Sequence, residues 1–147
     1  MIDVITSGGR DHRGMWLIWP EMDAIRSEFG EIQVRQGACY PPVRQGRRED
    51  RSADWLVHRW CLDRGVEDVE YPAQWALCSP ICPDKPHRKA RRDGSTYCPL
   101  AGHARNQDMV NDGARVLLAF PELGSRGTWD CVKRAKAAGI EVRVVTP

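Results

Sequence analysis

Short apolar runs alternate with amphipathic segments along the chain. The apolar runs are typical of buried strands and read "IDVIT", "EIQVR", "VEDVEY", "RVLLAF" and "EVRVV". Strands that alternate with helices at this spacing form βαβ units and a parallel sheet that helices cover on both faces. We therefore expect an α/β fold with a doubly wound, five-stranded parallel sheet in the order 3-2-1-4-5 and right-handed crossovers.

Four segments between the apolar runs have the spacing of amphipathic helices. In the second of them, apolar residues recur at i, i+3, i+4, i+7 and i+8, and Gly65 follows as a helix stop. In the first, we expect Pro20 in the first turn and Gly30 as the stop. Cys61 and Cys131 fall on apolar helix faces, so we interpret them as core residues. The expected helices are Pro20–Phe29, Ala53–Arg64, Arg105–Asn111 and Thr128–Ala138.

The length and composition of the chain predict one domain over residues 1–147. The chain is 41% hydrophobic, which is enough for one full core. No apolar run approaches the roughly 20 residues that span a bilayer, so we expect a cytoplasmic protein without a membrane partner. A compact chain with insertions would suit a phage or mobile-element gene of an actinobacterium, and a phage protein would work in the host cytoplasm.

Two insertions interrupt the βαβ pattern. Residues 73–102 are rich in proline, cysteine, histidine and basic side chains, and the segment "CYPPVRQGRRED" follows the second strand. A structureless loop of about thirty residues is unusual in a compact domain, so something must organise the longer insertion. The insertions contain the basic runs Arg44–Arg51 and Lys85–Arg92. We interpret these runs as solvated loop charge, because the net charge of the chain is only +2.

The longer insertion carries the pattern of a metal site. Cys78, Cys82, His87 and Cys98 follow the spacing C-x3-C-x4-H-x10-C. Three thiolates and one imidazole are a common closed ligand set for structural Zn2+. Zn2+ would order a loop that has no apolar core of its own. His103 is an alternative fourth ligand, and three exposed free thiols are the alternative to a metal site.

The two loops richest in glycine follow the first and fourth strands. In the order 3-2-1-4-5 these strands meet where the strand order reverses, and ligands of open parallel sheets bind at that point. Gly8 and Gly9 leave backbone N–H groups open to an anion, and Arg10 could pair with it. Gly127 and Thr128 begin the last helix, where free N–H groups and the helix dipole favour phosphate. The loop residues expected to bind the ligand are Ser7, Gly8, Gly9, Arg10, Asp11, Gly124, Arg126, Gly127 and Thr128.

Both loops have a simpler interpretation. The segment "SGG" after a strand is often only a turn, and "GSRGT" could be a helix start that a serine or threonine caps. Neither loop has the dinucleotide fingerprint G-x-G-x-x-G or the Gly-Lys-Ser/Thr of a P-loop. The sequence therefore does not indicate a hydride-transfer enzyme or an ordinary ATPase.

The motifs "TSGGRD", "SADWLVHRW", "RGVEDVEYPAQW", "AGHARNQDMV" and "VLLAFPELGSRGTWDCVKRAKAAGIEVRVV" occur in this order. This order resembles the YspA-like branch of the SLOG superfamily, Rossmann-like proteins related to the Lonely Guy and DprA families. The resemblance covers nearly the whole chain apart from the two insertions. It implies that the loops after strands one and four bind a nucleotide or a nucleotide-derived ligand. It also implies binding roles for Asp54 and for Arg105 and Asn106 of the "RN" pair.

The chain departs from the enzymes of this superfamily at one position. Lonely Guy proteins cleave the bond between a base and ribose 5-monophosphate, and they have a glutamate three residues after the threonine of the glycine loop. Cys131 occupies that position here, and the nearest acid is Asp130. The candidate catalytic residues that could replace the glutamate are Asp11 and Asp54.

The function expected from the sequence is the binding of a nucleotide-derived small molecule by a sensor, a sequestering protein or a weak enzyme. One alternative is an N-glycosidic hydrolase that acts on a nucleoside monophosphate or an ADP-ribose-like molecule. Another is a nucleic-acid-binding module that uses the basic insertions. The apolar segment "MWLIW" indicates a buried helix start or, alternatively, a contact between copies of the chain in a homo-oligomer.

Overall fold

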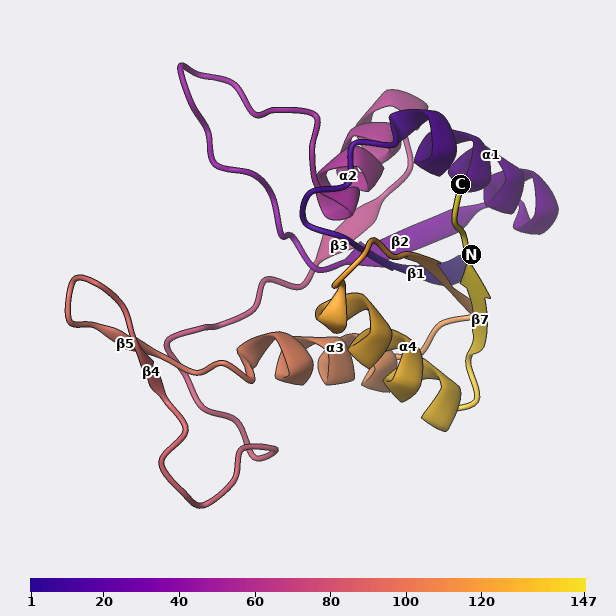
Figure 1. Cartoon of the computed structure of the whole chain (residues 1–147). Coiled ribbons are helices and arrows are strands. Elements are labelled where there is room, and N and C mark those ends of the chain that lie inside the picture. Colours follow the sequence, from indigo (N-terminus) through magenta and orange to yellow (C-terminus); the bar gives the residue numbers. More distant parts are fainter.

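Five parallel strands form the centre of the protein, which a computed structural model describes over residues 1–147 (Figure 1). The strands are β1 (Ile2–Gly8), β2 (Ile32–Gln36), β3 (Asp68–Glu70), β6 (Val116–Phe120) and β7 (Glu141–Val144). Their order is β3-β2-β1-β6-β7, and each neighbouring pair is parallel. The predicted doubly wound sheet is confirmed, because β6 and β7 are its fourth and fifth strands.

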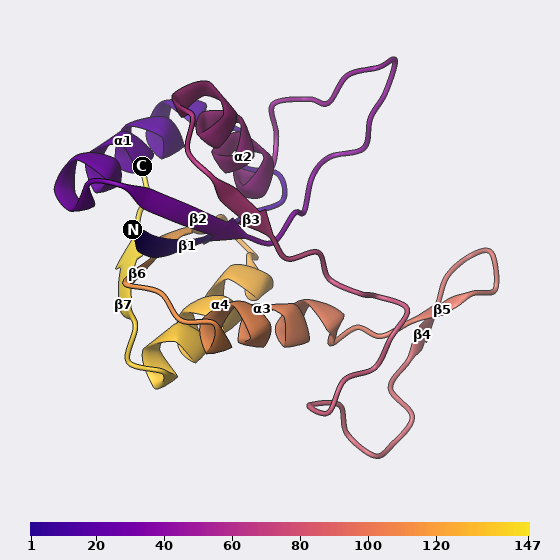
Figure 2. The same cartoon turned by 180° about the vertical axis from the view of Figure 1, so that it is seen from behind.

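Two helices cover each face of the sheet, as Figures 1 and 2 show from opposite sides. One face packs against α1 (Met15–Phe29) and α2 (Ala53–Arg64), and the other against α3 (Ala101–Asn111) and α4 (Arg126–Ala137). Each helix of a pair also contacts its partner. None of these helices combines the length and the apolar content needed to cross a membrane.

The first helix is longer than the sequence pattern predicts. α1 begins at Met15, so the prediction that Pro20 lies in its first turn is wrong. Ile18 is fully buried, and the indole N–H of Trp19 donates to the carbonyl of Leu56 in α2 at 2.9 Å. These contacts outweigh the hydrogen bond that a proline removes from a helix. They also confirm that "MWLIW" is a helix start with a buried face.

The other helix bounds agree more closely with the sequence pattern. The bounds of α2 are those predicted, because Ser52 caps its first turn and Gly65 ends it in a left-handed conformation. α3 begins at Ala101 rather than Arg105, and α4 begins two residues before Thr128. Both early turns consist of small or polar residues, which carry no apolar periodicity.

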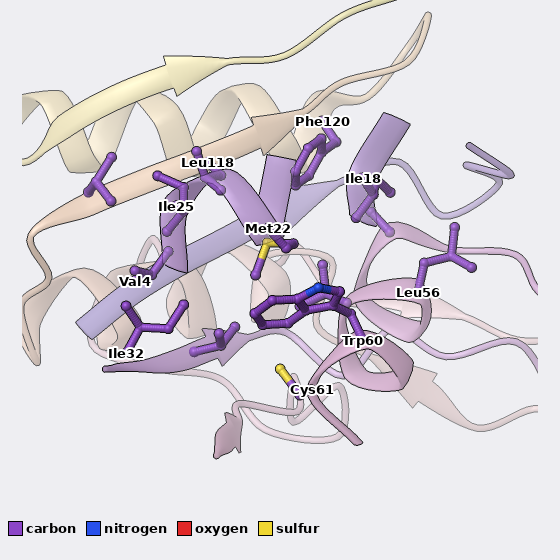
Figure 3. Packing of buried hydrophobic residues seen from close by; sticks show 14 residues of the cluster. Val4, Ile18, Met22, Ile25, Ile32, Leu56, Trp60, Cys61, Leu118 and Phe120 are labelled. Atoms are coloured by element: carbon purple, nitrogen blue, oxygen red, sulfur yellow. The ribbon is translucent and has the colours of Figure 1, made fainter. Parts of the chain in front are cut away.

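Trp60 lies in the larger hydrophobic core, between the sheet and the pair α1 and α2 (Figure 3). Its side chain is fully buried, and its indole N–H donates to Asp23 at 2.9 Å. Arg64 pairs with the same carboxylate at 3.1 Å. Cys61 packs in this core and Cys131 in a second core under α3 and α4, which confirms both as core residues. Burial raises the pKa of the Cys131 thiol to about 12.

The two insertions extend away from the body of the domain (Figures 1 and 2). The shorter one joins β2 to α2, and the longer one joins β3 to α3. The longer one contains an antiparallel hairpin of β4 (Lys89–Ala90) and β5 (Thr96–Tyr97), which the sequence pattern did not predict. Strands of two residues are too short to produce a periodic signal.

Candidate functional site

The carboxyl ends of β1 and β6 lie side by side at one cavity of about 420 Å3. The strand register pairs Gly8 with Phe120, so the loops that follow the two strands are neighbours. The candidate carboxylates Asp11 and Asp54 line this cavity. All residues predicted to bind the ligand line it as well: Ser7, Gly8, Gly9, Arg10, Asp11, Arg105, Asn106, Gly124, Arg126, Gly127 and Thr128. The two predicted glycine loops therefore share a single site.

Glycine is needed in both loops for different reasons. A Cβ atom on Gly8 would lie 2.8 Å from the carbonyl oxygen of Phe120 and would overlap the side chain of Ala53. Gly124 has a φ of 80°, a left-handed conformation that side chains disfavour. Where it leaves β1, the first loop is therefore packed closely against β6 and α2. The second loop turns sharply before α4.

Several polar groups at the cavity have no partner within the protein. The backbone N–H groups of Arg10 and Asp11 in the first loop donate to no other group, and neither do those of Gly127 and Thr128 in the first turn of α4. The hydroxyl of Thr6, near the end of β1, is buried without a hydrogen bond. A helix start also carries partial positive charge. An anion in this cavity could therefore accept hydrogen bonds from two loops at once.

The charged residues of the first loop differ in their contacts. The guanidinium of Arg10 lies over the ring of Trp75, with its Cζ atom 5.5 Å from the ring centroid. Asp11 pairs with Arg51 of the shorter insertion at 2.9 Å, and its side chain is 78% exposed. Arg10 is thus available to a ligand anion, whereas Asp11 is a solvated carboxylate with a partner of its own.

Asp54 is the buried carboxyl group of the cavity. It lies in the first turn of α2 and is only 7% exposed. Burial raises the pKa of this carboxyl, while the N–H of Cys39, 3.0 Å from Oδ2, and the charge of Arg105 oppose that rise. Asp54 is therefore easier to protonate than an exposed aspartate, which suits a group that transfers protons.

Arg105 and Asn106 donate hydrogen bonds that fix the backbone around the cavity. The guanidinium of Arg105 donates to the carbonyl oxygens of Gly37 at 2.5 Å and Tyr71 at 3.1 Å, directly after β2 and β3. Asn106 is buried, and its amide donates to the carbonyl of Gly127 at 3.1 Å. These bonds are internal to the protein. Asn106 positions the second glycine loop through Gly127, and Arg105 joins the chain after β2 to the chain after β3 at the cavity wall.

Two ionisable residues beside the glycine loops were missed in the sequence. Glu122 packs its carboxylate against Gly9, and its backbone N–H donates to the hydroxyl of Ser125 at 2.8 Å. His12 is 6% exposed, and its Nδ1 accepts the N–H of Gly14 at 3.0 Å. Burial lowers the pKa of His12, and the charge of Glu122 acts in the opposite direction. In the sequence, the only sign of a role for either residue was its place in one of the two glycine loops.

The position at which the sequence resemblance would place a glutamate lies in the core. Cys131 is fully buried beneath the sheet. Asp130 accepts hydrogen bonds from Asn106 at 3.1 Å and Arg134 at 2.9 Å, and it does not line the cavity. Neither residue therefore supplies a carboxylate to the ligand site.

The longer insertion gathers four predicted metal ligands into one cluster. The Sγ atoms of Cys78, Cys82 and Cys98 and one ring nitrogen of His87 lie within 4.8 Å of one another. Nε2 of His87 is 3.5 Å from Sγ of both Cys78 and Cys98, and Sγ of Cys82 is 3.5 Å from Sγ of Cys98. The cluster could hold a metal ion. His103 is not part of it and instead lies 3.8 Å from Asp130.

Neighbouring groups orient this metal cluster. Nδ1 of His87 lies 2.9 Å from the carbonyl of Lys85, which leaves Nε2 as the ligand atom. The backbone N–H of Ser79 lies 3.4 Å from Sγ of Cys82 and lowers the pKa of that thiol to about 7. Such contacts around a ligand set are typical of metal sites.

The basic runs of the insertions are partly used within the protein. Arg48 lies over the rings of Tyr40 and Trp55, with Cζ 5.5 Å and 5.3 Å from their centroids. Arg88 donates to Thr96 at 3.1 Å and to Sγ of Cys78 at 3.3 Å. Much of this charge therefore organises the insertions themselves.

Comparison with known proteins gives one relative of similar length. The chain is similar to the Gene 61 protein of Mycobacterium phage D29, with 29% identity over 141 residues. The match covers 95% of this chain and 92% of that protein. No protein-family model matches the chain, and no solved structure matches it. A phage relative that spans both insertions agrees with the expectation of a phage gene.

Proposed function

We propose that the protein binds a nucleotide or a nucleotide-derived ligand between the glycine loops, as a sensor or sequestering protein. The observation that carries the proposal is that the loops after β1 and β6 line the same cavity with unpaired backbone N–H groups. Phosphate is the ligand group that such loops bind best. The resemblance to YspA-like proteins of the SLOG superfamily supports the same class of ligand.

The cavity also has the size for this ligand and an arginine that can bind its phosphate. Its volume of about 420 Å3 lies within the range of sites for small molecules. In the proposal, the phosphate lies at the first turn of α4, near Gly127 and Thr128. Arg10 leaves the ring of Trp75 and pairs with the phosphate, because a guanidinium binds phosphate more strongly than it binds an aromatic ring.

A thermal-shift screen tests the proposal. Nucleoside mono-, di- and triphosphates and ADP-ribose are added to the wild type, to Arg10→Ala, to Thr128→Ala and to the control Arg115→Ala at the far end of β6. A ligand at 100 times its Kd stabilises a protein by about 2.7 kcal/mol, or about 5 to 10 °C in a domain of this size. We expect this shift in the wild type and the control, and a smaller one in the other variants. No shift, or an equal shift in all four proteins, would contradict the proposal.

For the metal cluster we propose structural Zn2+. A tetrahedral site with Zn–S near 2.3 Å and Zn–N near 2.0 Å has edges of about 3.5 to 3.8 Å between ligand atoms. Three of the observed separations are 3.5 Å. Four protein ligands leave no open position, so the ion would hold the insertion together rather than bind a substrate.

Asp54 favours a second candidate function, an N-glycosidic hydrolase acting on a nucleoside monophosphate or an ADP-ribose-like molecule. A carboxyl that lines the cavity could stabilise a cationic sugar or transfer a proton. Chromatography of AMP and ADP-ribose incubated with the protein would detect a released base. We then expect release to be lost in Asp54→Asn and kept in Asp11→Asn, whose carboxylate is exposed and paired with Arg51. No release by the wild type would leave binding as the function.

A further inference from the structure

Trp75 is the aromatic residue of the longer insertion that lines the cavity, where Pro99 and Gly102 of the same insertion accompany it. Its carbonyl accepts the backbone N–H of Cys98, a member of the metal cluster, at 2.7 Å. Its ring lies edge to face against Tyr97, with centroids 6.4 Å apart. The far edge of the ring would be 3.4 Å from a Cβ atom on Gly102, in the first turn of α3. The metal cluster, the hairpin and α3 together fix the ring at the cavity wall.

The contact with Arg10 shows that one face of this ring is open to a planar group. The guanidinium of Arg10 lies over the ring, 5.5 Å from its centroid. Guanidinium groups stack on aromatic rings in the same way as nucleobases do. When Arg10 pairs with a phosphate of the ligand, this face of Trp75 becomes free. This movement of Arg10 would thus make the site accessible both to the phosphate and to the base of a nucleotide.

There is space beside the ring for a base and its substituents. A second cavity of about 440 Å3 adjoins the first, and the two share Arg10, Asp11, Gly37, Cys39 and Trp75 as lining residues. The wall of the second cavity contains Tyr40, Pro41 and Pro42 of the shorter insertion, and Pro72 and Ala73 from the segment after β3. Trp75 stands where the two cavities meet, between the glycine loops and this partly apolar wall.

We propose that Trp75 is the stacking platform for the nucleobase of the ligand, and that the metal-binding insertion holds it in place. The inference rests on the proposed nucleotide site and makes it more specific. The glycine loops bind the phosphate without regard to the base, and Trp75 supplies the preference for a nucleotide over a simple sugar phosphate. Stacking of a base on an aromatic ring strengthens binding by about 5- to 150-fold.

Calorimetric titration separates the two contributions. The probes are AMP, GMP, CMP and UMP, with ribose 5-phosphate as the compound that has the phosphate and sugar but no base. The proteins are the wild type, Trp75→Ala, Trp75→Phe and the control Trp16→Ala, which removes an exposed tryptophan that does not line the cavity. Circular dichroism and metal content confirm that each variant keeps its fold and its cluster.

The expected result is a change in preference rather than a general loss. The wild type and Trp16→Ala bind at least one nucleotide about 5-fold or more tighter than ribose 5-phosphate. Trp75→Ala loses this preference but binds ribose 5-phosphate within about 2-fold of the wild type, and Trp75→Phe keeps most of the preference. An unchanged preference in Trp75→Ala, or none in the wild type, would overturn the inference and leave the phosphate site standing. If the wild type binds none of the five probes and the thermal-shift screen also gives no shift, the proposed function fails as well.

Discussion

The carboxylate of Glu122 fills the space that a side chain at Gly9 would need. A Cβ atom on Gly9 would lie 2.9 Å from Cδ of Glu122 and closer still to one of its oxygens. At Gly8, in contrast, the obstacles are the carbonyl of Phe120 and the side chain of Ala53. A flexible carboxylate can move away, whereas a strand carbonyl and a packed helix cannot.

The two neighbouring glycines should therefore respond differently to the same substitution. Gly8→Ala is expected to lower the free energy of unfolding by about 1 to 3 kcal/mol, because the new methyl group overpacks a rigid site. Gly9→Ala is expected to lower it less than Gly8→Ala does, because only the flexible side chain of Glu122 has to move. Urea denaturation of both variants measures the difference, and equal losses would contradict this interpretation.

Metal analysis tests the cluster in the longer insertion. Protein purified without chelator is expected to carry about one zinc per chain, and Cys98→Ser is expected to lose it. Cys39→Ser is the control, because Cys39 lies outside the cluster. The sheet and its four helices do not depend on the insertion for their core, so far-ultraviolet circular dichroism should change little. Less than about 0.2 zinc per chain, without a loss in Cys98→Ser, would rule out the site.

The stability of the protein should fall in mild acid because of His12. Burial lowers the pKa of this histidine in the folded state, and its Nδ1 accepts a hydrogen bond from Gly14. The unfolded chain therefore takes up a proton near pH 6.5, where the folded protein does not. This contribution to stability is complete above pH 6.5 and declines as the pH falls toward the lowered pKa of the folded state.

The variant His12→Asn keeps an acceptor for Gly14 but does not titrate. Urea denaturation at pH 7.5 and at pH 5.5 is expected to show a larger loss in the wild type than in this variant. Other groups that titrate in this range affect both proteins equally and cancel in the comparison. A variant that loses as much stability as the wild type would show that His12 is not the cause.

Trp60 should be among the residues on which the fold depends most. Trp60→Ala is expected to cost about 3 to 5 kcal/mol, because it leaves a cavity in the larger core and removes one of the two hydrogen-bond partners of Asp23. Trp16→Ala is expected to change stability by no more than about 0.5 kcal/mol, because that side chain is 69% exposed. Thermal or urea unfolding of the two variants compares the same deletion in the core and on the surface.

The sheet and the ligand loops could be predicted because local patterns encode them. Apolar runs marked all five strands, and the reversal of strand order placed the glycine loops at one edge. The spacing of Cys78, Cys82 and Cys98 indicated the metal cluster. The sequence left His103 as an alternative to His87 for the fourth ligand, because both lie close to Cys98 in the chain. The fold decides between them, since only His87 lies beside the thiols.

The features that the sequence did not reveal depend on tertiary contacts. The early start of α1 follows from the packing of Ile18 and Trp19 and not from helix signals, which Pro20 obscures. The placement of Glu122 against Gly9 joins two loops more than a hundred residues apart. Trp75 lies in a segment without regular periodicity, and its contacts with Cys98, Tyr97 and Gly102 bring it to the cavity.

The hydrogen bond between Trp75 and Cys98 also bears on protein engineering. It joins the two ends of the segment 76–97, which contains the hairpin and Cys78, Cys82 and His87 of the cluster. A segment whose ends already meet can be exchanged for another of different length at little entropic cost. The body of the domain could thus serve as a scaffold on which replacement loops are grafted above the cavity, with the sheet and both cores unchanged.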